Sequence, residues 1–240
     1  MNVWELCKGS QYIKPLSVEP WRVVEAQHIL SSRDLVDSRE EHDLLEELLE
    51  QSKPAIEKEK NYLIFTPFRY PPLKYGSRFG RTFEPSLWYG SIELETAFTE
   101  VAYYRLKFLN DSQGDLGYLE ISMTAFTAFL TTPRGLDLTK TPFNQYVEQI
   151  SAKNDYAYSQ PLGSAMRQEQ IEAFIYPSAR TANSATNIAA YTPAVFKMKK
   201  SQYVNNQQTW ICLANKQVIE FTRMGILGKE RFSFDAHYFM

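Results

Sequence analysis

The pattern of apolar and polar positions predicts two clear helices in this chain. In the first, leucines recur at helical spacing from Leu44 to Leu49 while acidic residues occupy the opposite side. Ser38 followed by Glu41 is typical of a capping box at the start of such a helix. In the second, residues 92–109 place their apolar side chains on one side at about 100° per residue.

Shorter patterns predict strands and further helices. Residues 117–126 alternate between apolar and polar positions, which is typical of a strand exposed on one face. Other strands are predicted at 61–68, 87–90, 173–176, 187–196 and 209–223, the last as a hairpin that turns near Asn215. Additional helices are predicted at 20–31, 141–153 and 159–172. The sum predicts an α+β fold, with a mostly antiparallel β core surrounded by helices.

The order of these elements suggests a division near residue 60. Before it, the patterns are helical or irregular, and Pro20 suits the first turn of a helix. Residues 58–61 are polar and read as a linker. We therefore expect an N-terminal helical extension over residues 1–60 and the main domain over residues 61–240.

Composition narrows the classes of function. A hydrophobic content of 44% and an aromatic content of 14% are sufficient for a folded core, which excludes a disordered chain. The formal net charge is −2, so no overall positive field favours nucleic acid, and we expect no direct nucleic-acid partner.

The positions of the cysteines, histidines and apolar runs bear on metal binding and on membrane insertion. Cys7 and Cys212 stand far apart, and neither they nor the scattered histidines have the spacing of a metal site. The segment MNVWELCKGS has no basic region followed by a long apolar run, and no window approaches eighteen apolar residues. We expect a cytoplasmic protein with no metal and no membrane span.

Residues 65–108 are rich in arginine and tyrosine, side chains that bind phosphate and stack on flat rings. Gly76 and Gly80 flank Arg78 and permit tight backbone turns, although the Gly-Lys-Ser/Thr of a nucleotide-triphosphatase loop is missing. An alternative reading pairs Arg78 with a nearby acid such as Glu84, and reads Glu100 as a solvated surface residue.

The spacing of four motifs resembles a known family. Arg78, Tyr89 and Glu100 follow one another at intervals of eleven residues, in RFGR, WYGS and AFTEV, and IYPSAR with Ser178 and TNIAAY with Asn187 come much later. This order resembles the RES domain family, named for its arginine, glutamate and serine. The resemblance covers about residues 60–200. The long segment before it is a departure from a compact member.

The resemblance implies an ADP-ribosyltransferase-like fold and a bacterial toxin that destroys NAD, restrained by an Xre-like antitoxin. Carried over to this chain, it implies that Glu100 stabilises the ribose cation and Arg78 binds the pyrophosphate. Tyr89 would line the nicotinamide pocket, and Ser178 would orient Glu100 or the ribose. We expect further contacts from Arg69, Tyr75 and Asn187.

Several alternatives stay open at the level of sequence. Water as the acceptor of ADP-ribose would make the chain a glycohydrolase, and phosphate would make it a phosphorylase. A protein acceptor would make the chain a mono-ADP-ribosyltransferase. A third reading is an inactive RES-like binding module. No residue pattern fixes the oligomeric state, and a homo-oligomer is one of the open alternatives.

Overall fold

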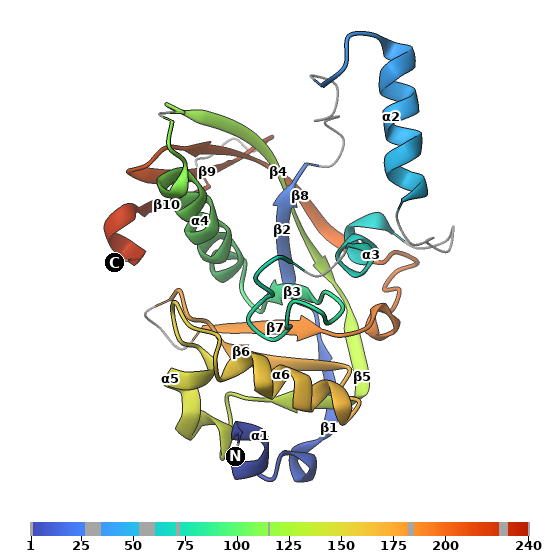
Figure 1. Ribbon diagram of the computed structural model, residues 1–240, viewed down its shortest axis with the longest axis vertical. Helices are drawn as coiled ribbons and strands as arrows, with labels where there is room; N and C mark the ends of the chain where they lie inside the picture. The colour runs from blue at the N-terminus through green and yellow to red at the C-terminus, as the bar shows by residue number, and fades with distance from the viewer. Residues whose placement is uncertain are drawn as a thin grey trace.

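The computed structural model describes residues 2–26, 35–52, 61–70, 73–114, 116–181, 185–225 and 230–239. Within these residues, ten strands form one sheet with the order β1-β5-β6-β7-β3-β2-β4-β8-β9-β10 (Figure 1). The strands are β1 (Lys14–Val18), β2 (Trp21–Glu25), β3 (Trp88–Ser91), β4 (Leu119–Ala128), β5 (Leu130–Asp137), β6 (Ala173–Pro177), β7 (Thr186–Ala190), β8 (Val204–Ala214), β9 (Val218–Arg223) and β10 (Arg231–Asp235).

Neighbouring strands pair antiparallel except β5 and β6, which pair parallel. The predicted α+β fold with a mostly antiparallel core is therefore confirmed. Two strands next to each other in the middle of the sheet, β2 and β3, pair at a single position, where Trp21 lies opposite Ser91. Beyond Trp21 the two strands diverge, and this opening is where the candidate site lies.

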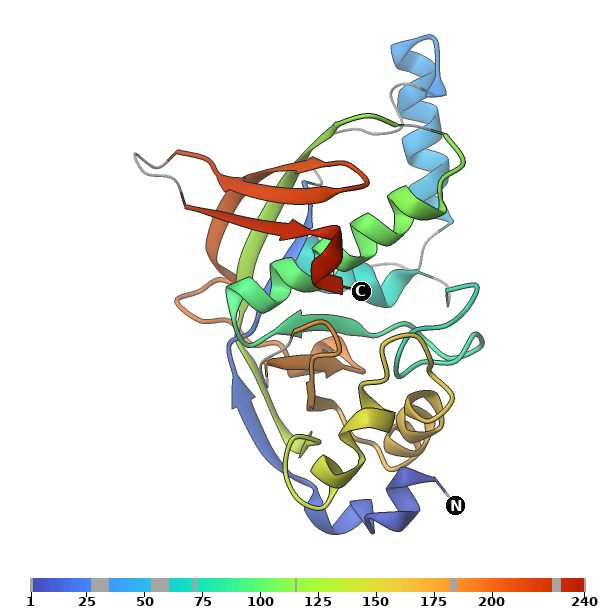
Figure 2. The same cartoon turned by 90° about the vertical axis from the view of Figure 1, so that its left-hand side faces the viewer.

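The helices are α1 (Val3–Leu6), α2 (Arg39–Gln51), α3 (Tyr62–Arg69), α4 (Leu94–Asp111), α5 (Val147–Ile150) and α6 (Ser159–Gln168). Short 3-10 turns complete them at Gly9–Tyr12, Phe143–Tyr146, Pro193–Val195 and Ala236–Phe239. Figure 2 shows α4 lying across one face of the sheet, next to the C-terminal 3-10 turn, while α5 and α6 cover the other end of the molecule.

The buried side chains form three clusters that follow this arrangement. Phe98 of α4 packs against Trp210 and Phe221 of β8 and β9, with ring centroids 4.6 Å apart in both pairs. Phe79 and Phe174 join α6 in a second cluster, and Trp88 with Phe196 joins α3 in a third. Because α4 is held by one of these clusters, the direction in which each of its residues leaves the helix is set too.

The helix predicted at 20–31 is wrong where the structure describes it. Residues 21–25 form strand β2, and residues 27–31 lie outside the described residues. Pro20 and the apolar residues fit the start of a helix, but the segment pairs with β4 over five positions, from Trp21 opposite Thr127 to Glu25 opposite Met123. Tertiary pairing has overridden a weak local preference.

The strand predicted at 61–68 is a helix, α3. The side chain of Asn61 accepts a hydrogen bond from the backbone N–H of Leu63 at 2.9 Å, which caps the first turn. Leu63, Ile64 and Phe65 are all buried. A short apolar run does not distinguish a buried strand from a buried helix, and the amide cap decides between them.

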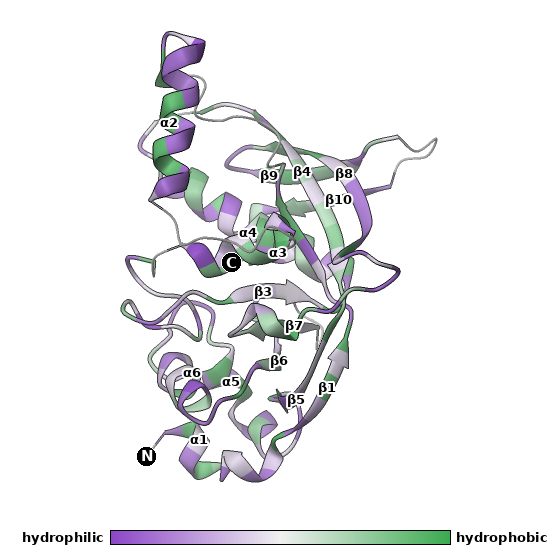
Figure 3. Cartoon of the chain, turned by 90° about the vertical axis from the view of Figure 1, so that its right-hand side faces the viewer, coloured by the Kyte–Doolittle hydropathy of each residue, from purple (hydrophilic) through white to green (hydrophobic). Residues whose placement is uncertain are grey.

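The predicted helix after Ser38 is confirmed as α2, with the reciprocal bonds of a capping box between Ser38 and Glu41. α2 stands away from the sheet and carries an apolar stripe between polar sides (Figure 3). Leu44 and Leu48 on that stripe are 56% and 55% exposed. Of residues 1–60, α1 and α2 are helical, whereas β1 and β2 belong to the central sheet.

The remaining predicted elements differ from the structure mainly at their ends. The helix at 92–109 is α4, and the hairpin turns where the side chain of Asn215 accepts hydrogen bonds from the N–H groups of Gln217 and Val218. The helix predicted at 141–153 is a 3-10 turn followed by the four-residue α5. Within the described residues, no helix has both the length and the apolar character needed to cross a membrane.

Candidate active site

Glu100 lies at the centre of a hydrogen-bond network that joins three distant parts of the chain. Its Oε1 atom accepts a hydrogen bond from Ser178 Oγ at 2.7 Å and another from Asn187 Nδ2 at 2.6 Å. Glu100 is in the second turn of α4, Ser178 follows β6, and Asn187 is in β7. Two donors to one carboxylate oxygen fix the direction of the carboxylate.

The two donors are themselves held in place. Ser91 Oγ donates to Asn187 Oδ1 at 2.7 Å, which turns the amide nitrogen of Asn187 toward Glu100. The backbone N–H of Arg180 donates to Ser178 Oγ at 3.1 Å, so the hydroxyl hydrogen of Ser178 is left for Glu100. Ser91 and Asn187 are 2% exposed, so this part of the network is shielded from competing water.

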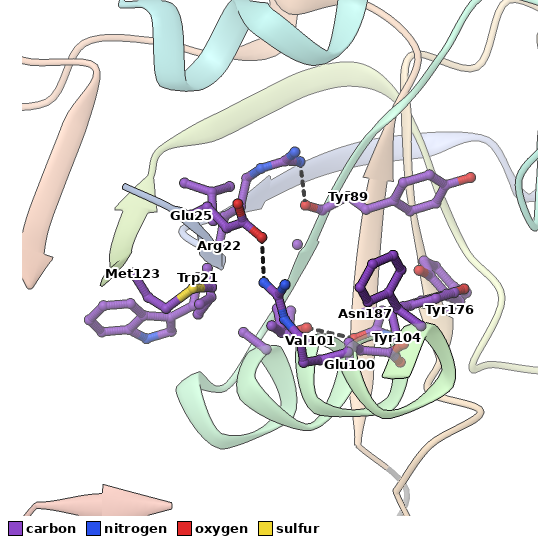
Figure 4. Close-up of a pocket in the computed structure, with 17 residues that line it drawn as sticks. Trp21, Arg22, Glu25, Tyr89, Glu100, Val101, Tyr104, Met123, Tyr176 and Asn187 are labelled. Atoms are coloured by element: carbon purple, nitrogen blue, oxygen red, sulfur yellow. Dashed lines mark hydrogen bonds and ion pairs between the residues drawn. The ribbon is translucent and has the colours of Figure 1, made fainter. Parts of the chain in front are cut away.

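A cavity of about 410 Å³ opens beside Glu100, in the space where β2 and β3 diverge. Its volume is in the range of small-molecule sites. Figure 4 shows Trp21, Arg22 and Glu25 of β2 on one side, with Glu100, Val101 and Tyr104 of α4 facing them. Tyr176 and Asn187 lie at the end nearest Glu100, and Tyr89 lies beside Arg22. The carboxylate therefore meets a mostly apolar hollow.

Arg22 bridges the two diverging strands. Its Nη1 atom donates to the backbone carbonyl of Tyr89 at 2.8 Å, and its guanidinium lies 5.1 Å from the centroid of the Trp88 ring. Burial lowers the pKa of Arg22 to about 10, so the side chain is still charged at neutral pH. Its Nε atom is buried and has no hydrogen-bond partner among the described residues.

Arg22 and Tyr89 also line a second hollow of about 250 Å³ together with Gly76, Ser77 and Leu87. The two hollows therefore share these two side chains as a common wall. A half-buried cation where two cavities meet is suited to bind an anionic group of a ligand.

Tyr89 connects the glycine-flanked loop to β3. Its hydroxyl forms a 2.9 Å hydrogen bond with Ser77 Oγ and accepts a 3.3 Å bond from the backbone N–H of Phe79. Burial raises the pKa of Tyr89 to about 12, so the phenol is neutral at physiological pH. Its ring lies 6.4 Å from the ring of Tyr176, at an interplanar angle of 82°.

Arg78 is buried close to the site but does not line the cavity. Its Nη1 atom donates to the carbonyls of Ala152 at 2.8 Å and Ile150 at 3.3 Å, and its guanidinium lies 5.1 Å from the Tyr156 ring. Arg78 and Glu100 both affect Tyr176: burial raises the pKa of its hydroxyl, the charge of Glu100 raises it further, and Arg78 lowers it.

Of the other predicted site residues, one lies at the site and two lie elsewhere. Asn187 contacts Glu100 directly, as described above. Arg69 instead pairs with Glu50 at 2.6 Å and joins α3 to α2. Tyr75 is 77% exposed and does not line the cavity. The alternative partner of Arg78, Glu84, accepts a hydrogen bond from the backbone N–H of Arg81 at 2.8 Å.

Several residues at the site were missed in the sequence. They are Trp21, Arg22, Glu25, Ser91, Tyr104, Arg105, Tyr176 and Arg180. For Arg22 and Glu25 the sequence does contain an indication. Both are charged residues within the run WRVVE, whose tryptophan and valines are typical of strands, and charged residues in such a run can mark a binding site. Arg180 lies with its guanidinium 3.4 Å from the Tyr103 ring, a contact that no sequence pattern indicates.

The described residues contain no group of three histidine, cysteine, aspartate or glutamate side chains that could hold a metal ion. The donors that converge at the site are instead guanidinium, hydroxyl and amide groups around one carboxylate. This set is suited to an organic ligand with negative charge in its middle and a cationic centre at the carboxylate.

The sequence and the structure were each compared with known proteins. The family model of the RES domain matches residues 55–212. Among solved structures, the chain is similar to one from the Mycobacterium tuberculosis MbcT–MbcA toxin–antitoxin complex, with a TM-score of 0.48 and 12% sequence identity, covering 81% of this chain and 85% of that one. No curated protein matches.

Proposed function

This chain belongs to the RES domain family, and from that premise we propose that it is the toxin of a bacterial toxin–antitoxin pair and cleaves the nicotinamide–ribose bond of NAD. The observation that carries the proposal is the Glu100 carboxylate, held by Ser178 and Asn187 at the wall of a cavity of about 410 Å³. Because NAD is an intracellular dinucleotide, we expect the protein to act in the cytoplasm.

The proposed chemistry places a fixed negative charge beside a developing positive one. When the glycosidic bond breaks, its electron pair leaves with the pyridinium nitrogen, which becomes neutral nicotinamide, and the ribose acquires oxocarbenium character. A carboxylate already oriented by two donors stabilises that cation without reorganising. The acceptor oxygen then bonds to the ribose carbon and releases its proton. Nicotinamide leaves as a neutral molecule, so no general acid is required.

Arg22 is better placed than Arg78 to bind the pyrophosphate. Arg22 lines the same cavity as Glu100 and lies where the two hollows meet, whereas both hydrogen bonds of Arg78 described above go to backbone carbonyls. The role of Arg78 as a pyrophosphate ligand stays a prediction. Its position beside Tyr156 supports a structural role, which is to hold the 150–156 segment against the site.

The first test is the release of nicotinamide from NAD by the purified chain. Glu100→Gln keeps the shape of the side chain but removes its charge, so we expect the rate to fall by roughly 10²- to 10³-fold. Glu95→Gln, an exposed position on the same helix, is the matched control and should keep the parent rate. Parent activity in Glu100→Gln would contradict the proposed role.

The products of the same reaction identify the acceptor. Free ADP-ribose indicates that water is the acceptor, and ADP-ribose 1-phosphate indicates that phosphate is. With NAD labelled in its adenylate part, label that stays on protein indicates a mono-ADP-ribosyltransferase. If wild-type protein releases no nicotinamide under any of these conditions, the inactive binding module becomes the better reading.

We also propose an Xre-like antitoxin as the partner, because an enzyme that consumes NAD must be restrained in its own cell. A partner that closes the cavity beside Glu100 would block substrate. We expect the product of a neighbouring gene to co-purify with this chain and to suppress nicotinamide release. Cells that tolerate the active chain without any partner would contradict this proposal.

A further inference from the structure

An ion pair lies at the far end of the cavity, away from the glutamate network. The Nη2 atom of Arg105 donates to Glu25 Oε1, which joins α4 to β2. Both residues line the cavity. The proposed cleavage reaction uses neither of them, so the pair needs a separate explanation.

The cavity extends from Glu100 to this pair along two parallel walls. On β2 the lining residues follow the strand from Trp21 to Glu25, and on α4 they extend from Ala97 to Phe108. Phe108 is eight residues beyond Glu100, so the helix places it about 12 Å further along its axis. A ligand whose ribose lies at Glu100 therefore has room to continue toward Glu25.

The far end has the surfaces that a second nucleoside needs. The side chain of Phe108 gives an exposed apolar surface on which a flat base can lie, and Met123, which is 1% exposed, lies in the core at this end of the cavity. Phe108 is 57% exposed, so this end is open to solvent. Within the ion pair, the side chain of Glu25 is 57% exposed and that of Arg105 is 16% exposed. The acid is thus the member that an entering ligand meets first.

We infer that Glu25 accepts a hydrogen bond from the 2′-hydroxyl of the adenosine ribose and selects dinucleotides without a phosphate at that position. This inference rests on the proposed function. A 2′-phosphate would bring a second negative group next to the Glu25 carboxylate, and like charges at a few ångströms repel strongly when partly desolvated. A carboxylate that accepts from a ribose 2′-hydroxyl is a general solution to this kind of recognition.

Arg105 does not reverse this preference. Its guanidinium is engaged by Glu25 and is largely covered. To bind a 2′-phosphate it would have to leave Glu25, which would then stand unpaired beside the phosphate. Arg105 instead fixes the direction of the carboxylate, and it is a positioning residue for Glu25.

The test compares kcat/KM for NAD and NADP in three proteins. Wild type should prefer NAD by at least about tenfold, since each 1.4 kcal/mol of repulsion is a factor of ten. Glu25→Gln removes the charge, keeps the shape and leaves Arg105 without this carboxylate, so the preference should fall to unity or below, mainly through a gain with NADP. Glu120→Gln, an exposed strand position outside the cavity, should keep the wild-type ratio.

The outcomes separate this inference from the proposed function. A wild type that cleaves NAD and NADP equally, or a Glu25→Gln variant that keeps the wild-type ratio, overturns the role of Glu25 alone. If Glu25→Gln fails to fold, Glu25→Asp shortens the side chain, keeps the charge, and should keep the discrimination against NADP. A wild type that cleaves neither dinucleotide contradicts the proposed function, and the inference falls with it.

Discussion

Tyr89 has a neutral phenol that holds two parts of the site together. Its hydroxyl connects to Ser77 and Phe79, its backbone carbonyl accepts a hydrogen bond from Arg22, and the residue lines both hollows. Burial is the main reason its pKa rises to about 12, because an ionised phenolate would lose its solvation there. The same burial makes Tyr89 a source of pH-dependent stability.

We predict that Tyr89→Phe changes the alkaline unfolding of the protein. As the pH rises from about 10 to about 12, an unfolded tyrosine loses its proton while the folded Tyr89 keeps it, so the free energy of unfolding falls. The phenylalanine variant lacks this proton and should lose less stability over that window. At neutral pH it should already be less stable by about 1 kcal/mol, through the lost hydrogen bonds.

Urea unfolding of wild type and variant at about pH 9 and about pH 11.5 measures this difference. Tyr118→Phe, a residue that is 74% exposed, is the matched control and should behave like wild type. Equal alkaline losses in wild type and Tyr89→Phe would show that the phenol is not held neutral by burial.

For individual residues, the sequence predicts the hydrogen-bond partners of Glu100 better than it predicts which arginine lines the cavity. Glu100, Ser178 and Asn187 are close together as the family spacing implies, with Tyr89 nearby. Two arginines line the cavity, Arg22 and Arg105, and neither lies in the motifs used to make the prediction. Spacing along the chain orders the motifs, but which guanidinium faces the hollow depends on how β2 and β3 diverge.

Among the elements, β2 has the largest effect on the site. It is made by residues 21–25, yet it lies between β3 and β4 and supplies one wall of the cavity. β4 pairs with it over five positions, and Val23 enters the core cluster of α4. An early segment of the chain is thus an internal strand of the sheet.

We therefore expect that residues 61–240 do not fold when produced alone. Without β1 and β2, strands β4 and β5 lose partners, and Leu16 and Val23 no longer cover the core. Circular dichroism and denaturant titration should show no cooperative transition. Replacing residues 36–52 with a glycine–serine linker keeps both strands and is the matched control.

A cooperative transition in residues 61–240 would instead support the predicted domain boundary at residue 60. The sequence predicts a boundary there because the patterns before it are helical or irregular, and a five-residue strand such as β2 gives little periodicity to detect. Longer elements were predicted better. α2 has its capping box and α4 its apolar side. β4 is a strand as predicted, but residues 123–128 are buried on both faces, because α4 and the neighbouring parts of the fold cover the face that the alternation assigns to solvent.

The whole molecule can be described as two packed ends joined at a divergence in one sheet. The α4 cluster supports the end with β8, β9 and β10, and the α6 cluster supports the end with β5, β6 and β7. The cavity lies where β2 of one end meets β3 of the other (Figures 1 and 4). Fold class was predictable from element patterns, whereas this divergence depends on long-range pairing that no local pattern shows.

The site draws on residues from Arg22 to Asn187, and this spread has a consequence for protein synthesis. A ribosome makes the chain from its N-terminus, so the strand with Arg22 emerges long before β7, which carries the last of the groups around Glu100. Under the proposed activity, a nascent or prematurely terminated polypeptide that stops short of β7 cannot consume dinucleotide. The cell then has the whole interval of translation in which to supply an inhibitor before the first competent molecule exists.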